Sequence, residues 1–142
     1  MQTEQVIVAR LLAAPLEKVW QALTDCEKMK QWYFDLPDFR AEAGCAFQFY
    51  GGTPEKQFLH LCVVTEVVHL KKIAYSWRYD GYAGVSHVAF ELFQEDGGTR
   101  LLLTHTGLDS FPADVPELAS HNFAAGWNHI IHVSLPAFVE QS

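Results

Sequence analysis

Apolar residues near the N-terminus change their spacing, which predicts a strand followed by two short helices. Residues 4–12, EQVIVARLL, are rich in β-branched and aliphatic side chains, as strands are. After Pro15, which suits the first position of a helix, apolar residues recur at i, i+3, i+4 and i+7: Leu16, Val19, Trp20 and Leu23. Asp25 then provides an N-cap for a second short helix over residues 26–32, CEKMKQW.

The middle of the chain alternates apolar and polar residues with period two, which predicts an antiparallel meander. The alternation begins at Phe39 and continues for about seventy residues. Turn signals interrupt it at Ala43-Gly44, Gly51-Gly52, Lys71-Lys72, Gly81 and Gly97-Gly98. We therefore expect six consecutive strands after the two helices.

One face of this predicted sheet is rich in large apolar and aromatic side chains. Alternation places the following residues on it: Phe47, Phe49, Ile73, Tyr75, Trp77, Tyr79, Val88, Phe90, Leu92, Leu101, Leu103 and His105. A sheet so apolar on one side must be covered, and the remaining long helical candidate is the C-terminal segment. The pattern therefore predicts an α+β fold in the order β-α-α-β-β-β-β-β-β-α.

The C-terminal segment predicts an amphipathic helix with its histidines on the water side. At about 100° per residue, one arc contains Phe123, Ala124, Trp127, Ile130, Ile131, Ser134, Leu135 and Phe138. His129, His132 and Pro136 fall on the opposite side, so His129 and His132 are not expected to form a metal site. Pro136 should bend the helix over the sheet. Gly126 indicates either close approach of another segment or a tolerated helical glycine.

Composition indicates one domain, residues 1–142, with apolar surface to spare for a cavity. The chain has 142 residues, of which 49% are hydrophobic, 13% are aromatic and 19% are charged. A chain of this length can bury about two thirds of its unfolded surface around one core. The aromatic share is above that of an average soluble domain, and the charged share is below it.

Charge and cysteine usage exclude several classes of partner and compartment. The net charge of -7 leaves no basic excess for phosphates, so nucleic acid is not an expected partner. Three cysteines without a C-x-x-C spacing indicate free thiols in a reducing cytoplasm rather than a disulfide framework. The N-terminus resembles no secretory signal, and no apolar run is long enough for membrane insertion. We expect a cytoplasmic protein, monomeric or homodimeric.

Five blocks of sequence, in this order, resemble a known family. They are APLEKVWQALTDCEKMKQWY, AEAGCAFQFYGG, VVTEVVHLKKIAYSWRY, DGGTRLLLTHTGL and GWNHIIHVSL. Together they resemble the SRPBCC superfamily of START-like, Bet v 1-like helix-grip domains, and within it the activator of heat shock protein 90 ATPase homologue-like family. The resemblance covers residues 5–140. The chain departs from the family pattern at Cys45, where a second glycine is usual, and at His69-Leu70, where prolines are common.

The resemblance implies a curved antiparallel sheet around the C-terminal helix, with a cavity between them for an apolar or amphipathic small molecule. Such a cavity suits a lipid-like or aromatic ligand that a few polar groups position. The residues that we expect to line it are Trp32, Phe47, Phe49, Tyr75, Trp77, Phe90, Leu103, His105, Trp127 and Ile131. No cofactor and no metal are expected.

His105 is the one histidine predicted to point inward from a strand, and three roles stay open for it. It is a hydrogen-bonded core residue, a ligand anchor or a general base. Tyr75, Tyr79 and Glu66 are candidate polar neighbours, although a strand bulge would change the facing of Glu66.

Three functions are consistent with this pattern. The first is a binding module for a small hydrophobic molecule. The second is an enzyme of polyketide cyclase or hydrolase type that uses His105 with a tyrosine. The third is a chaperone-associated protein, by analogy with the family name, although the eukaryotic co-chaperone carries an additional domain that 142 residues do not contain.

Overall fold

The computed structural model describes residues 5–34, 36, 39–52, 57–112, 114–115, 118 and 120–140. Its strands are β1 (Gln5–Leu12), β2 (Ala46–Gly52), β3 (Gln57–Val68), β4 (Lys72–Tyr79), β5 (Ser86–Glu95) and β6 (Gly98–Thr106). Its helices are α1 (Leu16–Thr24), α2 (Cys26–Trp32), the 3-10 turn η1 (Leu108–Ser110), α3 (Ser120–His129), the π-helical turn η3 (Ile130–Ser134) and α4 (Leu135–Val139).

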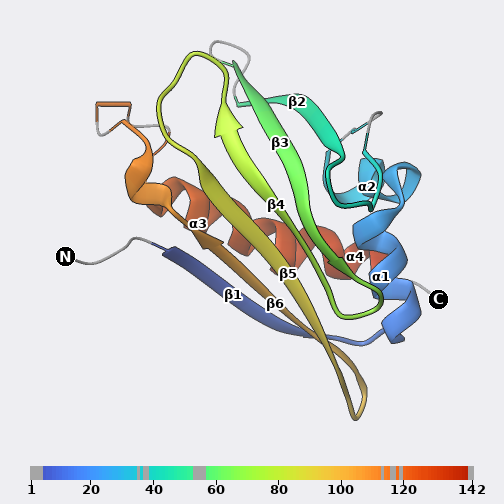
Figure 1. The fold of residues 1–142 in the computed structure, drawn as a ribbon. Helices are drawn as coiled ribbons and strands as arrows, with labels where there is room; N and C mark the ends of the chain where they lie inside the picture. Colours follow the sequence, from blue (N-terminus) through green and yellow to red (C-terminus); the bar gives the residue numbers. More distant parts are fainter. Residues whose placement is uncertain are drawn as a thin grey trace.

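The strands form one antiparallel sheet that curves around the C-terminal helix (Figure 1). Its order is β1-β6-β5-β4-β3-β2, so the last strand of the meander, β6, pairs with β1. The predicted α+β fold is confirmed. The inward set of the predicted sheet is also buried, from Phe47 on β2 to His105 on β6.

The two short helices between β1 and β2 begin close to the predicted positions. Val19, Trp20 and Leu23 of α1 are buried, as the helical spacing predicts. The Asp25 carboxylate accepts a hydrogen bond from the Glu27 backbone N–H at 3.0 Å, which confirms it as the N-cap of α2. Pro15 is itself the N-cap of α1 rather than its first helical residue.

The meander contains five strands rather than the six predicted, because residues 39–42 form a turn instead of a strand. Their backbone groups bond locally: Glu42 N–H donates to the Arg40 carbonyl at 2.8 Å, and Arg40 N–H donates to the Cys45 sulfur at 3.3 Å. A strand would need those groups for a neighbouring strand. Phe39 is nevertheless buried, edge-on to the Phe47 ring.

The helical wheel is wrong for Pro136, which is buried and not exposed. The cause is the π-helical turn η3, where the Leu135 N–H bonds the Ile130 carbonyl five residues earlier. The wider turn rotates the following residues, so Pro136 and Val139 reach the core and Phe138 is only half-buried. It also suits the proline, which has no N–H and would clash with the His132 carbonyl in a regular α-helix.

Gly126 makes no close approach to another segment, although the sequence allowed one. A Cβ atom built on it meets no atom within 4 Å, and the residue is exposed. It is therefore a tolerated helical glycine on the water side of α3.

We expect Gly126→Ala to stabilise the protein by about 0.5–1 kcal/mol, because alanine loses less backbone entropy on entering a helix. Ala125→Gly, at the adjacent exposed position, should destabilise it by a similar amount. The free energy of unfolding in urea measures both changes. A destabilising Gly126→Ala would show that the backbone at this position does need close contact.

Candidate functional site

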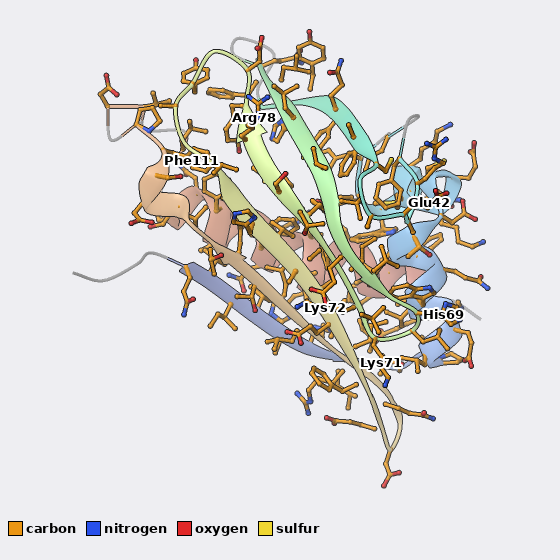
Figure 2. The ribbon with its side chains drawn as sticks, in the orientation of Figure 1. Glu42, His69, Lys71, Lys72, Arg78 and Phe111 are labelled. Carbon is orange, nitrogen blue, oxygen red and sulfur yellow. The ribbon has the colours of Figure 1, made fainter. Side chains whose placement is uncertain are left out.

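A layer of aromatic rings fills the interior between the sheet and α3. Trp127 of α3 lies at its centre, with ring centroids 5.7 Å from Trp77 on β4 and 5.9 Å from Phe90 on β5. Phe111, which follows η1 and is labelled in Figure 2, closes one end of the layer against Tyr79 and Phe123. Aromatic contacts of this kind add to the stability that burial alone provides.

The structure brings the predicted cavity residues together in this layer. All ten are buried: Trp32, Phe47, Phe49, Tyr75, Trp77, Phe90, Leu103, His105, Trp127 and Ile131. Trp32 also donates its indole N–H to the Ala22 carbonyl at 2.9 Å, which ties α2 to α1. Whether these residues contact a ligand stays a prediction.

Tyr33 and Phe34, which were not predicted, occupy the middle of the same space. Both follow α2 and lie outside any helix or strand. The Tyr33 ring stacks on Trp127 at 6.0 Å and 23°, and the Phe34 ring stacks on Phe49 at 4.5 Å and 29°. The sequence signal is the run of three aromatic residues in QWYF, residues 31–34, which begins with Trp32 at the end of the helical pattern and continues beyond it.

Three tyrosine hydroxyls, those of Tyr33, Tyr75 and Tyr79, lie inside this layer. The Tyr33 and Tyr75 hydroxyl oxygens are 2.7 Å apart, and Tyr79 accepts a hydrogen bond from the Trp77 indole at 2.8 Å. Burial raises the pKa of all three phenols, so they stay neutral and serve as hydrogen-bond donors and acceptors. Glu66 is not part of this group.

Glu66 points away from the interior because β3 contains a bulge between Val64 and Glu66. The side chain is exposed, and its carboxylate pairs with Lys72 at 3.1 Å. Glu66 is therefore removed from the candidate polar residues.

His105 is fully buried, and both of its ring nitrogens are hydrogen-bonded. Trp127 donates its indole N–H to Nδ1 at 3.0 Å, and Nε2 lies 2.7 Å from the Ser86 hydroxyl. Because an indole only donates, Nδ1 must accept, and the ring hydrogen is therefore on Nε2. Ser86 in turn donates to the Trp77 carbonyl at 2.9 Å. Every donor and acceptor in this series has a partner.

This tautomer makes His105 a poor general base. Burial, with a smaller contribution from His87, lowers the pKa of His105 to about 3. A base acting on Ser86 would need a free lone pair on Nε2, but that nitrogen carries the hydrogen. Of the three roles open to His105, the structure favours the hydrogen-bonded core residue.

His60, which was not predicted, is a second buried histidine at the other side of the layer. Its ring stacks on Phe49 at 4.3 Å and 16° and lies edge-on to Trp77 and Tyr79. Nδ1 is 3.0 Å from the Phe58 carbonyl. Burial lowers the pKa of His60 to about 4, against the opposing effect of the backbone carbonyls.

Gly51 provides the space for this histidine. A Cβ atom at position 51 would lie 2.9 Å from His60 Cε1, closer than such contacts normally come. The glycine thus allows the imidazole to lie across strand β2.

His129 and His132 are exposed, as the helical wheel predicts. His132 Nδ1 lies 3.4 Å from a guanidinium nitrogen of Arg10 on β1. A cation next to this nitrogen does not favour a metal ion there.

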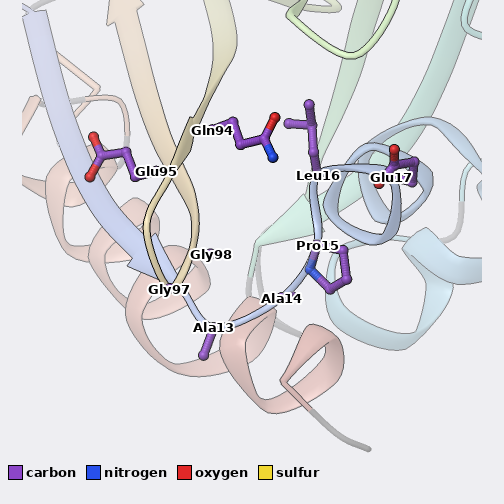
Figure 3. Close-up of a pocket in the computed structure, with 9 residues that line it drawn as sticks. All are labelled: Ala13, Ala14, Pro15, Leu16, Glu17, Gln94, Glu95, Gly97 and Gly98. Atoms are coloured by element: carbon purple, nitrogen blue, oxygen red, sulfur yellow. The ribbon is translucent and has the colours of Figure 1, made fainter.

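Two surface pockets lined by described residues lie outside the aromatic layer. One of about 390 Å³ lies between the start of α1 and the β5–β6 hairpin (Figure 3). Its Glu95 carboxylate is already held by Arg100 at 2.6 and 3.0 Å. A second, of about 640 Å³, lies beside the β3–β4 turn against Leu92 and Phe93.

A curved antiparallel sheet closed by a C-terminal helix over an aromatic interior defines the class of this protein, a START-like helix-grip domain of the SRPBCC superfamily. A family model described as "Activator of Hsp90 ATPase homolog 1-like protein" matches residues 13–140. The chain belongs to this family. Comparison with curated proteins finds no match.

Solved structures share this fold at low sequence identity. A protein from Chromobacterium violaceum is 23% identical with a TM-score of 0.80, covering 97% of this chain and 98% of its own. A Bacillus halodurans protein is 25% identical with a TM-score of 0.75, covering 98% and 99%. DynU16, described as a protein in the dynemicin biosynthetic locus, is 20% identical with a TM-score of 0.78, covering 96% of this chain and 47% of its own.

Among the residues that the structure describes, no helix has the length and apolar character needed to cross a membrane.

The two buried histidines predict a loss of stability in mild acid. The unfolded chain protonates both imidazoles below about pH 6.5, whereas the folded chain resists protonation until pH approaches about 4 for His60 and about 3 for His105. Stability is therefore complete above pH 6.5 and falls as the pH drops below it. Between pH 7 and pH 5 each histidine should remove about 2 kcal/mol from the free energy of unfolding.

Urea unfolding at the two pH values measures this loss. His60→Gln should reduce the loss by about half, whereas His129→Gln, which changes an exposed histidine, should leave it unchanged. An equal loss in the wild type and in His60→Gln would contradict the assignment of His60.

Proposed function

We propose that this protein binds a small, flat, mostly apolar molecule between the inner face of the sheet and α3. The observation that carries the proposal is the position of Tyr33 and Phe34. Two rings from a segment outside regular structure stack inside a layer that strands and helix otherwise supply. These rings occupy the space that a ligand would take.

The surroundings of Tyr33 indicate what chemistry the ligand has. Its ring is stacked on Trp127 and Trp32 and lies edge-on to Phe90, so a flat aromatic group fits there. Its hydroxyl meets the Tyr75 hydroxyl, so a ligand hydroxyl in the same place would keep a hydrogen-bond partner. A phenol-like or similar amphipathic molecule therefore suits this site best.

The origin of one structural relative is consistent with a small-molecule function. DynU16 is described as a protein in a biosynthetic locus. At 20% identity the likeness to this chain concerns the fold.

The enzymatic alternative receives less support from the interior. His105 was its catalytic candidate, and the hydrogen bond from Trp127 fixes the tautomer that cannot accept a proton from Ser86. The buried tyrosines have raised pKa values and do not act as bases near neutral pH. A binding function needs no catalytic base, and it explains the same geometry.

The chaperone-associated alternative rests on the family description, which refers to homologues of an Hsp90 ATPase activator. That description relates this chain to a family, but it does not establish that the chain binds a chaperone. Addition of the protein to a cognate chaperone, with the ATPase rate as the measurement, tests it separately.

The binding proposal is tested with 2-naphthol and naphthalene, which share two fused rings and differ by one hydroxyl. We expect both to give saturable shifts of the Trp127 indole resonance in NMR titrations. Tyr75→Phe should weaken 2-naphthol by about tenfold, because one hydrogen bond is worth about 1–1.5 kcal/mol, and should leave naphthalene unchanged.

Tyr33→Ala should strengthen binding of both molecules, because it removes the ring that competes for the space. Tyr50→Ala is its matched control, since Tyr50 is 66% exposed on β2. Absence of saturable shifts in both the wild type and Tyr33→Ala would overturn the proposal.

A further inference from the structure

Arg10 is an inward-facing arginine on a strand whose other inward residues are apolar. Val8 and Leu12 flank it on β1 and are buried, and Leu101 lies opposite on β6. The side chain of Arg10 is half-buried at the sheet edge where β1 contacts η3 of the C-terminal helix. A permanent positive charge is thus held between the edge strand and the helix.

The partners of this guanidinium leave most of its donors unused. One terminal nitrogen, Nη1, lies 3.4 Å from His132 Nδ1, a long contact for a hydrogen bond. The Nε atom is buried and has no hydrogen-bond partner; among the described side chains it is the one nitrogen or oxygen atom found in this condition. A buried charged donor without an acceptor is unfavourable, so the site is incomplete as it stands.

Carboxylates of the residues that the structure describes do not complete it. The ion pairs of the described chain join other residues, and none involves Arg10. Glu140, which follows α4, accepts from the Ala13 backbone N–H at 2.9 Å instead. The positive charge at the β1 edge is therefore available to a negative group from outside the chain.

We propose that Arg10 binds an oxyanion of a small molecule, a carboxylate or a phosphate group, at the edge where β1 meets η3. With Nη1 directed to His132, the Nε–H and the Nη2–H remain on the opposite side of the guanidinium, and this pair matches two oxygens of one oxyanion.

Binding at this place requires a small local movement. Because Nε is covered, the guanidinium or the exposed His132 ring must shift to admit the oxyanion. The site is separate from the aromatic layer, since neither Arg10 nor His132 takes part in the ring contacts there, and its test does not depend on the function proposed above.

Titration of the wild-type protein with inorganic phosphate and with acetate, at constant ionic strength set by chloride, tests the proposal. We expect a saturable shift of the Arg10 Nε–H resonance and of the backbone amides of residues 9–11. Arg10→Lys should weaken binding by about tenfold or more, because lysine keeps the charge and loses the two-pronged geometry.

The matched control is Arg78→Lys, which changes an exposed arginine on β4 (Figure 2) and should leave the titration unchanged. A shift that does not saturate, or equal weakening by both substitutions, would overturn the proposal. So would a response to phosphatidic acid in phosphatidylcholine vesicles without a response to free phosphate or acetate, because the partner would then be a membrane surface.

Discussion

The hydrogen bond from Trp127 to His105 links the C-terminal helix to the inner face of the sheet, and the interior is arranged around it. Both residues are buried, and the bond joins α3 to β6. It fixes the hydrogen of the imidazole on Nε2, which orders Ser86 and then the Trp77 carbonyl. An unpaired indole or imidazole here would be unfavourable in an apolar surrounding, so the helix and three strands are held in one relative position.

Much of the fold follows from local periodicity, and the predictions are wrong where tertiary contacts or a change of helix type determine the structure. Alternation placed Tyr75, Trp77 and Phe90 on the inner face because successive side chains of a strand must point to opposite sides. Pro136 was misplaced because the π-helical turn changes the angle per residue, and nothing in a wheel of constant angle signals such a turn. The alternation predicts a strand that begins at the apolar residue Phe39, but residues 39–42 form no strand, and Phe39 is buried edge-on to the Phe47 ring.

The sequence predicts the residues that surround the candidate site, but not the side chains that fill the space between them. The wall residues lie on regular elements, so their direction could be counted from the sequence. Tyr33 and Phe34 lie outside regular structure, where periodicity gives no direction. His60 was not predicted because apolar residues occupy both faces of this part of β3, Phe58 and Cys62 on one and Leu59 and Leu61 on the other, so the alternation gives no direction.

The residue at position 51 determines where the His60 ring can lie, so the two positions cannot be redesigned independently. The absent side chain at position 51 is what lets the imidazole lie flat against Phe49, although Gly51 itself belongs to the edge strand β2. A larger side chain at position 51, on the edge strand, would displace the His60 ring and so change the aromatic layer without a substitution of any of its rings. A substitution at position 51 would therefore change the shape of the interior from the edge of the sheet.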